Sequence, residues 1–146
     1  IIHSPYKTKE DCPIQGAAKP FGSGTVEVYP ELAEGLKDIE LFTHLILLYQ
    51  FDRAGEVKLQ RKPFMDDEEH GLFAMRHPCR PNSIGLSIVK LENVKGNILQ
   101  IRRVDVLDGT PLLDIKPYVP RFDHIEGASN GWLEKDDLSA KPEGRE

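Results

Sequence analysis

The chain has 146 residues, and its 19 lysines and arginines against 24 aspartates and glutamates give it a net charge of −5. This length predicts one compact domain with a hydrophobic core of its own, and the longest apolar run, residues 45–49, is far shorter than the roughly 20 residues of a membrane-spanning helix. The first residues lack a basic region followed by an apolar stretch, so we expect no secretory signal and a cytoplasmic location.

The first third of the chain predicts two short strands and one helix. Residues 1–6 read as a strand that ends at a proline, and the loop 7–24 that follows is longer than a connection without a function usually is. Residues 25–29 alternate between polar and apolar side chains with the period of a strand. A short helix then begins at Pro30, with Leu32, Leu36 and Ile39 on one face.

The remaining elements are mostly strands. Residues 44–51 are apolar on both faces, which predicts a buried strand at the centre of the sheet. Two further strands are expected at 57–61 and 71–75, on either side of an acidic loop at 66–69. The pattern also predicts a hairpin that turns at Gly96, with strands at 84–93 and 97–107, and a last strand at 112–116.

Many short strands with turn residues between them are typical of an all-β fold. We expect a mainly antiparallel β-barrel with one or two short helices, because closure removes the exposed edges of a sheet. The expected single domain covers residues 1–146, with a barrel core over about 1–117. From 118 to 146 the chain is rich in Pro, Gly and charge, and we expect an appendage over the barrel, held by Trp132 and Leu133, with a frayed end.

The composition gives no sign of a metal site. Cys12 and Cys79 are too few and too far apart for a disulfide scaffold or a thiolate site, so we expect two idle thiols. The five histidines show no spacing that would place two imidazoles on one helical face around zinc. We therefore expect no metal.

The charge distribution leaves nucleic-acid binding open. The acidic run at 66–69 and the tail at 134–146 together carry more negative charge than the net charge of the whole chain. In contrast, residues 76–121 contain eight lysines and arginines against four acids. A basic surface on an acidic protein is one interpretation of this excess, and an ordinary solvated face is the other.

Three loops contain residues suited to binding a small charged ligand, and each has a structural alternative. In the loop at 12–16, Gln15 and Gly16 suit a ligand or merely a turn. In the loop at 76–87, Arg76 and Arg80 suit a carboxylate or phosphate, or pair with the acidic run. The turn at 105–110 offers carboxylates beside an Asp-Gly pair that is also common in plain turns.

In combination, these segments carry a family resemblance. IHSPYKTKEDCPIQG (2–16), HLILLYQFDR (44–53), GLFAMRHPCRPNSIGLS (71–87) and DVLDGTPLLDIKPYVPRFD (105–123) resemble the TsaA/TrmO family. The specific part is R-x-x-x-RPN-x-IG-x-S together with DGTP-x-x-DIKPY, and the resemblance covers most of the chain. Members of that family are tRNA adenine N6-methyltransferases that use S-adenosyl-L-methionine on a small β-barrel.

The resemblance implies a cofactor site that many of these residues line: Pro13, Ile14, Gln15, Asp52, Arg53, Arg76, Leu86, Asp105, Val106, Leu107, Asp108, Gly109 and Thr110. The family often has a histidine where Asp52 stands, which puts the role of Asp52 in doubt. Arg76 would face the methionyl carboxylate, Asp108 the amino or ribose hydroxyl groups, and Leu86 the adenine or thioether. The candidates for the catalytic base are Asp52, Asp108 and Tyr118.

The resemblance further implies the substrate and the partners. The expected reaction methylates N6 of a threonylcarbamoyl-adenosine next to the anticodon of a threonine tRNA. A basic rim of Arg80, Lys116 and Arg121 would hold the anticodon loop, and a homodimer would contribute to RNA binding. Two alternatives stay open, a non-catalytic barrel that binds a nucleotide or RNA, and a methyltransferase for another small substrate.

Overall fold

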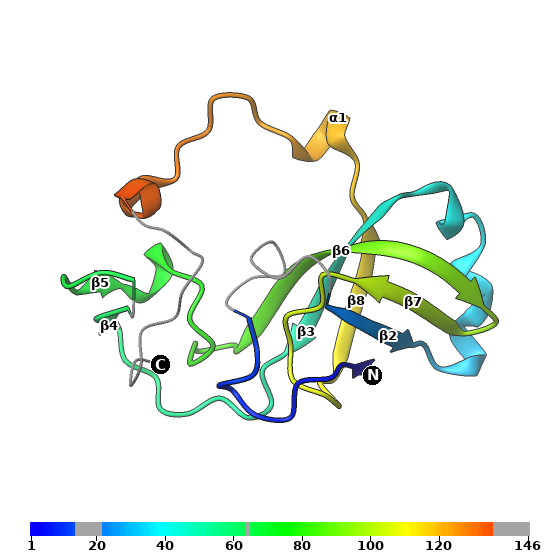
Figure 1. The fold of residues 1–146 in the computed structure, drawn as a ribbon, viewed down its shortest axis with the longest axis horizontal. Helices are drawn as coiled ribbons and strands as arrows, with labels where there is room; N and C mark the ends of the chain where they lie inside the picture. Colours follow the sequence, from blue (N-terminus) through cyan, green and yellow to red (C-terminus); the bar gives the residue numbers. More distant parts are fainter. Residues whose placement is uncertain (14–21, 64, 136–146) are drawn as a thin grey trace.

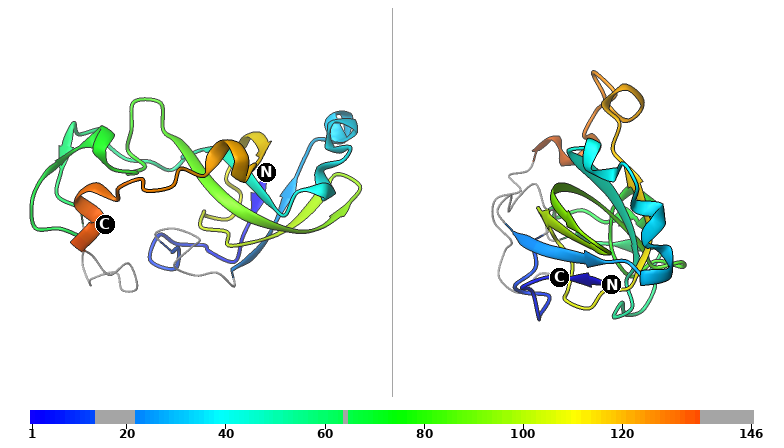
Figure 2. Two further views of the ribbon diagram at one scale, coloured as in Figure 1. Left: turned by 90° about the horizontal axis from the view of Figure 1, so that it is seen from above. Right: turned by 90° about the vertical axis from the view of Figure 1, so that its right-hand side faces the viewer.

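Six antiparallel strands form one strongly curved sheet, seen in three directions in Figures 1 and 2. The structure is a computed structural model, and it describes residues 1–13, 22–63 and 65–135. The strand order is β1-β2-β7-β6-β3-β8, with bounds Ile2–His3 for β1, Ser23–Glu27 for β2, His44–Gln50 for β3, Ile84–Lys95 for β6, Ile98–Arg102 for β7 and Leu112–Pro117 for β8. The predicted all-β, antiparallel class is therefore confirmed.

The two edges of this sheet meet at a single point. An isolated bridge joins Ile2 of β1 to Thr110, just before β8, and the Ile2 amide donates to the Thr110 carbonyl oxygen at 2.9 Å. In the part of the chain that the structure describes, the strand ladder itself does not close. The barrel and the division of the chain at about residue 117 thus stay predictions.

Strand β3 supplies a large part of the core. Leu45, Leu47 and Tyr49 are at most 3% exposed, because they alternate along β3 and point to the concave side of the sheet. Their partners on β6 are Val89, Ser87 and Gly85. The prediction that β3 is buried is confirmed, but its place at the centre is wrong, since β3 lies one position from the edge, between β6 and β8.

The hairpin of β6 and β7 has the predicted turn, with Gly96 at a φ of 60°. Its second strand is shorter than expected and ends at Arg102. The next residue, Arg103, has a φ of 68°, which takes the chain out of the ladder, and its amide donates to the Gly22 carbonyl oxygen at 2.7 Å. The segment from 103 to 111 therefore crosses the end of the sheet instead of extending β7.

The helix expected at Pro30 is two short 3-10 helices, η2 (Pro30–Leu36) and η3 (Ile39–Leu41). Asp38 separates them in a left-handed conformation with a φ of 68°. Leu36 is buried and Ile39 packs against the core, but Leu32 is 59% exposed. The predicted apolar face is only partly correct, because a 3-10 helix turns its residues by a different angle from an α-helix.

The strands expected at 57–61 and 71–75 are largely absent. The structure has two-residue strands, β4 (Gln60–Arg61) and β5 (His70–Gly71), which pair with each other beside the main sheet, and a 3-10 helix η4 (Leu72–Ala74) follows. We call residues 56–63 and 65–75 the side lobe. Its backbone has few partners in the main sheet, so alternation of side chains alone does not produce long strands there.

The last described segment forms an arch between the main sheet and the side lobe (Figures 1 and 2). It contains α1 (Pro120–Asp123) and ends at η5 (Gly131–Lys135), and every residue from 120 to 131 is exposed. Trp132 anchors the far end by stacking on His70 at 4.3 Å and by donating its indole N–H to the Ala74 carbonyl oxygen at 2.8 Å. The predicted anchor thus lies on the side lobe and not over the sheet, and residues 136–146 lie outside the described part.

Among the described residues, none of the helices has the length and apolar character needed to cross a membrane.

Candidate functional site

Three of the segments singled out in the sequence meet at one end of the sheet. The Gln50 amide at the end of β3 donates to the Pro111 carbonyl oxygen at 3.0 Å, and the Phe51 amide donates to that of Ser83 at 2.7 Å. Asp52 and Arg53 follow directly. The end of β3, the start of β6 and the turn before β8 therefore lie side by side, and we call this the β3 end.

A chain of three side chains crosses the concave face at the β3 end. The Tyr49 hydroxyl lies 2.9 Å from Ser87 Oγ, and Ser87 Oγ donates to Asp105 Oδ1. Tyr49 and Ser87 are each 3% exposed. Burial raises the pKa of Tyr49, the negative charge of Asp105 adds to that rise, and the cation of Arg76 acts against it.

Sequence reasoning missed Tyr49 and Ser87 as site residues. The available signal was the alternation of β6, in which Ser87 occupies the buried face between Gly85 and Val89 and is the polar exception there. A hydroxyl on that face needs a partner inside the protein.

The N-terminal loop reaches the same place. The Cys12 thiol donates to the main-chain carbonyl oxygen of Asp105 at 3.0 Å. Burial raises the pKa of Tyr6, and nearby Cys12 and Asp105 raise it further, which places Tyr6 beside both. Pro13, half-buried, comes directly after Cys12, while the predicted residues Ile14 and Gln15 lie outside the described residues.

Asp52, Arg53 and Thr110 lie together at the rim. Arg53 donates from Nη2 to Thr110 Oγ1 at 3.1 Å and from Nε to Asp52 Oδ1 at 3.2 Å. Thr110 is 3% exposed and its hydroxyl donates to the Leu107 carbonyl oxygen at 2.6 Å. This set offers one guanidinium and one exposed carboxylate to a ligand.

The structure brings Arg76 to the β3 end but leaves Leu86 apart. Arg76 is exposed, and its charge is near enough to the Tyr49 hydroxyl to affect that group's pKa. Leu86 is 41% exposed on the convex face of β6, opposite the neighbouring Ser87. Within one chain, Leu86 therefore does not share a side with Tyr49, Ser87 and Asp105.

Within the turn at 105–110, Asp108 has other partners than Asp105. Its carboxylate accepts from the Ser4 amide at 3.0 Å and from Lys7 Nζ. The Lys7 hydrogen bond, followed by that of Ser4, lowers the pKa of Asp108. Of the other turn residues, Val106 packs into the core at 5% exposure, and Gly109, with a φ of 78°, donates its amide to the Ile2 carbonyl oxygen at 2.9 Å.

The three residues expected at the RNA rim have separate surroundings. The Arg80 guanidinium lies 5.7 Å from the Phe73 ring centre and donates to the carbonyl oxygens of Leu72 and Met75, so it fastens the side lobe and does not pair with the acidic run. Lys116 pairs with Asp114 at 2.9 Å. Arg121 is exposed on α1.

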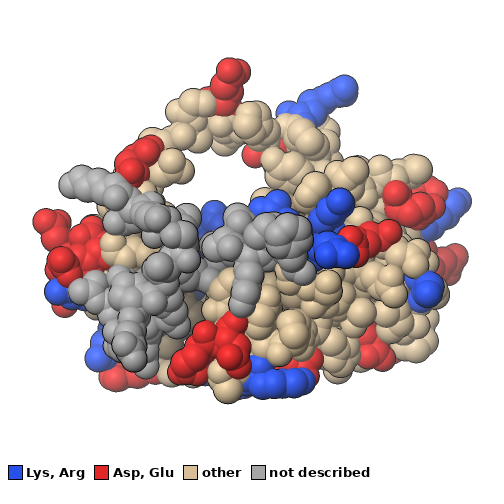
Figure 3. All heavy atoms as spheres, in the orientation of Figure 1, with Lys and Arg blue, Asp and Glu red and all other residues tan. Residues whose placement is uncertain are grey.

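A basic group, of which only Tyr118 was a candidate from the sequence, lies around His44 on the convex face. Burial lowers the pKa of His44, and the nearby cations Arg103 and Lys90 lower it further. The Tyr118 ring meets the His44 ring edge-on at 6.5 Å. We call His44, Lys90, Arg103 and Tyr118 the His44 cluster. Lys and Arg side chains gather along the side of the sheet that borders the gap below the arch (Figure 3).

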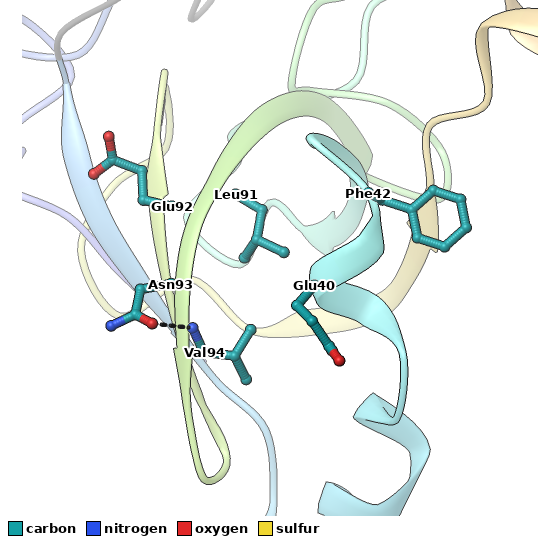
Figure 4. A pocket seen from close by; sticks show the side chains of 6 residues that line it. All are labelled: Glu40, Phe42, Leu91, Glu92, Asn93 and Val94. Carbon is teal, nitrogen blue, oxygen red and sulfur yellow. Dashed lines mark hydrogen bonds between the residues drawn. The ribbon is translucent and has the colours of Figure 1, made fainter.

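A groove of about 440 Å³ lies toward the hairpin end of β6, away from the β3 end (Figure 4). It is open to solvent between η3 and the hairpin, and it is lined by Glu40, Phe42, Leu91, Glu92, Asn93 and Val94. None of the predicted site residues lines it, and its two carboxylates would repel a phosphate.

The cysteines are in no disulfide, and Cys79 accepts a hydrogen bond from the Gly55 amide at 3.2 Å. Within residues 1–13, 22–63 and 65–135, no three His, Cys, Asp or Glu side chains are grouped so that they could hold a metal ion.

Comparison with known proteins agrees with the family resemblance of the sequence motifs. Residues 1–124 match the family model of the tRNA-methyltransferase O N-terminal domain. A probable S-adenosyl-L-methionine-binding protein of Pyrococcus abyssi is 61% identical over 135 residues, which are 92% of this chain and 73% of that protein. The tRNA (adenine(37)-N6)-methyltransferase of Mus musculus is 39% identical over 97 residues, 64% of this chain and 22% of that protein.

A solved structure agrees with this assignment. The crystal structure of TrmO from Pseudomonas aeruginosa superimposes with a TM-score of 0.75 at 38% identity and covers 90% of this chain. The match covers 58% of the Pseudomonas chain, so this chain spans little more than half of that protein's length. By its motifs, its fold and the match over residues 1–124, the chain belongs to the tRNA-methyltransferase O N-terminal domain family.

Proposed function

We propose that this chain binds S-adenosyl-L-methionine at the β3 end and methylates N6 of an adenosine next to the anticodon of a tRNA. The observation that carries the proposal is the convergence of Cys12, Arg53, Arg76 and Asp105 at that end. Membership of the family and the names of the relatives supply the reaction.

The side chains at the β3 end suit the chemical groups of this cofactor. The guanidinium groups of Arg53 and Arg76 match a carboxylate, whereas Asp52 and Asp105 match an ammonium or ribose hydroxyls. Asp108 and Leu86, which were expected to take part, have other surroundings in a single chain. When bound, the cofactor supplies a methyl group that its sulfonium already activates, so the protein mainly has to position the two reactants.

We propose the threonylcarbamoyl-adenosine of a threonine tRNA as the specific substrate. The exocyclic nitrogen of an N-acylated adenine is more acidic than an ordinary amine, so a modest base suffices to take its proton. Among the candidates, Asp52 is exposed at the rim and Tyr118 lies in the His44 cluster. The lowered pKa of Asp108 favours its charged form and so makes it a weaker base than an ordinary aspartate.

The RNA is proposed to lie over the His44 cluster. Lys90 and Arg103 supply charge for phosphates, and Tyr118 supplies a ring on which an unstacked base of the anticodon loop can lie. Lys116 and Arg121 would extend this surface, whereas Arg80 mainly fastens the side lobe. Such a surface fits a chain whose net charge is negative.

We further propose a homodimer that acts in the cytoplasm, where tRNA is modified. The convex face supports the dimer, because Ile84, Leu86 and Ile88 form an exposed apolar row along β6, between 38% and 48% exposed. Leu86 would then reach the cofactor of a second copy or pack in the interface. The barrel expected from the sequence would be completed at the bridge of Ile2 and Thr110.

One alternative has a specific observation in its favour. Several relatives, including that of Pyrococcus abyssi, are named as binding proteins and not as enzymes. A chain that binds S-adenosyl-L-methionine and transfers nothing would agree with those names. A methyltransferase for another small substrate has no observation of its own.

A transfer assay separates these functions. The purified chain is incubated with S-adenosyl-L-methionine labelled in its methyl group and with total tRNA, from cells with and without threonylcarbamoylation. We expect label in tRNA, at N6 of the adenosine beside the anticodon, in the threonylcarbamoylated sample. Binding without transfer to either tRNA would favour the binding module, and equal transfer to both tRNA samples would contradict the proposed substrate.

A further inference from the structure

The polar chain at the β3 end has a defined direction. An ionised aspartate only accepts hydrogen bonds, so the single O–H of Ser87 must donate to Asp105. Ser87 then has no proton left for Tyr49, and the Tyr49 hydroxyl donates to Ser87 Oγ at 2.9 Å. The raised pKa of Tyr49 keeps its proton in place at neutral pH. Two buried hydroxyls thus lie in series and end on one carboxylate.

The backbone of β6 is adapted to this chain. A Cβ atom at Gly85 would lie 2.1 Å from Tyr49 Cε2 and 2.8 Å from Phe51 Cζ. Only glycine therefore leaves room for the Tyr49 ring, which meets the Phe51 ring edge-on at 5.3 Å. Gly85 and Ser87 belong to the IG-x-S segment of the sequence motif. Neither residue was expected to contact the cofactor.

Asp105 is held from a second direction as well. The Cys12 thiol donates to its main-chain carbonyl oxygen at 3.0 Å, while Ser87 holds its side chain. Both partners come from segments that are distant in sequence. A carboxylate fixed in this way has one orientation, which is the condition for an effective ligand contact.

We propose that Ser87 and Tyr49 are positioning residues that aim the Asp105 carboxylate at a hydrogen-donating group of the cofactor, either its ammonium or its ribose hydroxyls. The proposal rests on the proposed function, because it takes S-adenosyl-L-methionine as the ligand. A carboxylate has about four acceptor positions, so it can accept hydrogen bonds from Ser87 and from a ligand at the same time.

The test is a double-mutant cycle on the Kd for S-adenosyl-L-methionine, measured by calorimetry on the whole chain. Asp105→Asn should raise Kd about tenfold or more, as expected for loss of a hydrogen bond to a charged group. Ser87→Ala should raise Kd about fivefold, and Tyr49→Phe by a smaller factor, since each acts through Asp105. In the Asp105→Asn background, Ser87→Ala should have no further effect.

Ser129→Ala is the matched control. Ser129 is exposed in the arch and has no part in the polar chain, so Kd should not change. Thermal unfolding of each ligand-free variant shows whether it is folded. If Ser87→Ala fails to fold, Tyr49→Phe, which removes one oxygen atom, completes the same cycle.

A second series of Kd measurements, with adenosine as the ligand, identifies the group that donates a hydrogen bond to Asp105. If Asp105→Asn weakens adenosine as much as S-adenosyl-L-methionine, the ribose hydroxyls are the donors. If only S-adenosyl-L-methionine is weakened, the ammonium is the donor, and either result supports the proposal. If Asp105→Asn weakens neither, the carboxylate is not a ligand contact and the proposal is wrong.

Two results overturn the positioning role itself. One is an unchanged Kd in folded Ser87→Ala and Tyr49→Phe, and the other is an equal effect of Ser87→Ala with and without Asp105→Asn, which would mean a merely structural role. In both cases the unmodified chain still binds the cofactor, so the proposed function stands. A folded, unmodified chain that binds no S-adenosyl-L-methionine would remove the proposed function and the positioning role together.

Discussion

Two aspartates in one turn, Asp105 and Asp108, differ in their partners. Asp105 is joined to Ser87 and Cys12 at the β3 end, whereas Asp108 is joined to Ser4 and Lys7 of the N-terminal segment. Both were expected at the cofactor, and the role of binding its amino or ribose hydroxyl groups was given to Asp108 with the family resemblance. Which carboxylate points to the site depends on the left-handed Arg103 and on the Cys12 contact, and neither is visible in a local pattern.

The contact of Lys7 with Asp108 should make stability depend on acid. The pKa of Asp108 is lowered in the folded chain, so its stabilising effect is complete above the ordinary value of 3.8 and is lost as the pH falls through the lowered value. Lys7→Met should lower the free energy of unfolding at pH 7 by about 0.5 kcal/mol, as for other exposed pairs. Urea unfolding at several pH values measures the difference, which should shrink below pH 3.8.

Lys9→Met is the control for Lys7→Met, since Lys9 makes no ion pair among the described residues. It should leave stability unchanged at every pH. A loss in Lys7→Met that persists undiminished in acid would show that Lys7 acts through packing.

At the scale of elements, the sequence predicts those strands that have their own periodicity and a partner nearby. Strand β3 follows from a short run that is apolar on both faces, and the hairpin follows from its turn residue Gly96. Strands were also predicted at 57–61, from alternation, and at 71–75, but strand formation depends on partners, and the described residues of these segments pair only in β4 and β5. The same reasoning explains Ser87 and Tyr49, whose contact exists only because β3 and β6 pair in a particular register.

The far end of the arch is held by Trp132, which stacks on His70 and donates a hydrogen bond to the Ala74 carbonyl oxygen. His70→Ala should shift the fluorescence of Trp132 to longer wavelength, because the indole loses its stacked neighbour and gains water. The sequence has a single tryptophan, so the signal belongs to this contact alone. We also expect faster proteolysis within the exposed residues 120–131.

His124→Ala serves as the comparison, because His124 is exposed within the arch and touches neither Trp132 nor the side lobe in the described contacts. Its fluorescence should equal that of the unmodified chain. An unchanged spectrum in His70→Ala would mean that the side lobe does not hold the arch in solution.

At the scale of the whole molecule, charge is distributed unevenly. The net charge is −5, yet the convex face carries the His44 cluster and the acidic run lies on the side lobe. An RNA would therefore meet one favourable side of an otherwise acidic protein.

Lys90→Glu should weaken tRNA binding about fivefold and make the dependence of Kd on salt less steep, because one phosphate contact is lost. Its Kd for S-adenosyl-L-methionine should be unchanged, since Lys90 pairs with His44 at the start of β3, at the opposite end of that strand from the β3 end. Filter binding at several salt concentrations measures the first quantity. Lys37→Glu makes the same charge change next to η2, and equal loss of RNA binding there would argue for a net-charge effect without a defined surface.

The bridge of Ile2 and Thr110 gives the molecule a seam. Two backbone hydrogen bonds join Ile2 to Gly109 and Thr110, and a third runs from the Asp108 amide to the Tyr6 carbonyl oxygen. Ser4 adds hydrogen bonds to Val106 and Asp108, and Lys7 pairs with Asp108. The first residues of the chain therefore fasten the turn that carries Asp105, so the position of this carboxylate depends on the start of the chain as well as on β6.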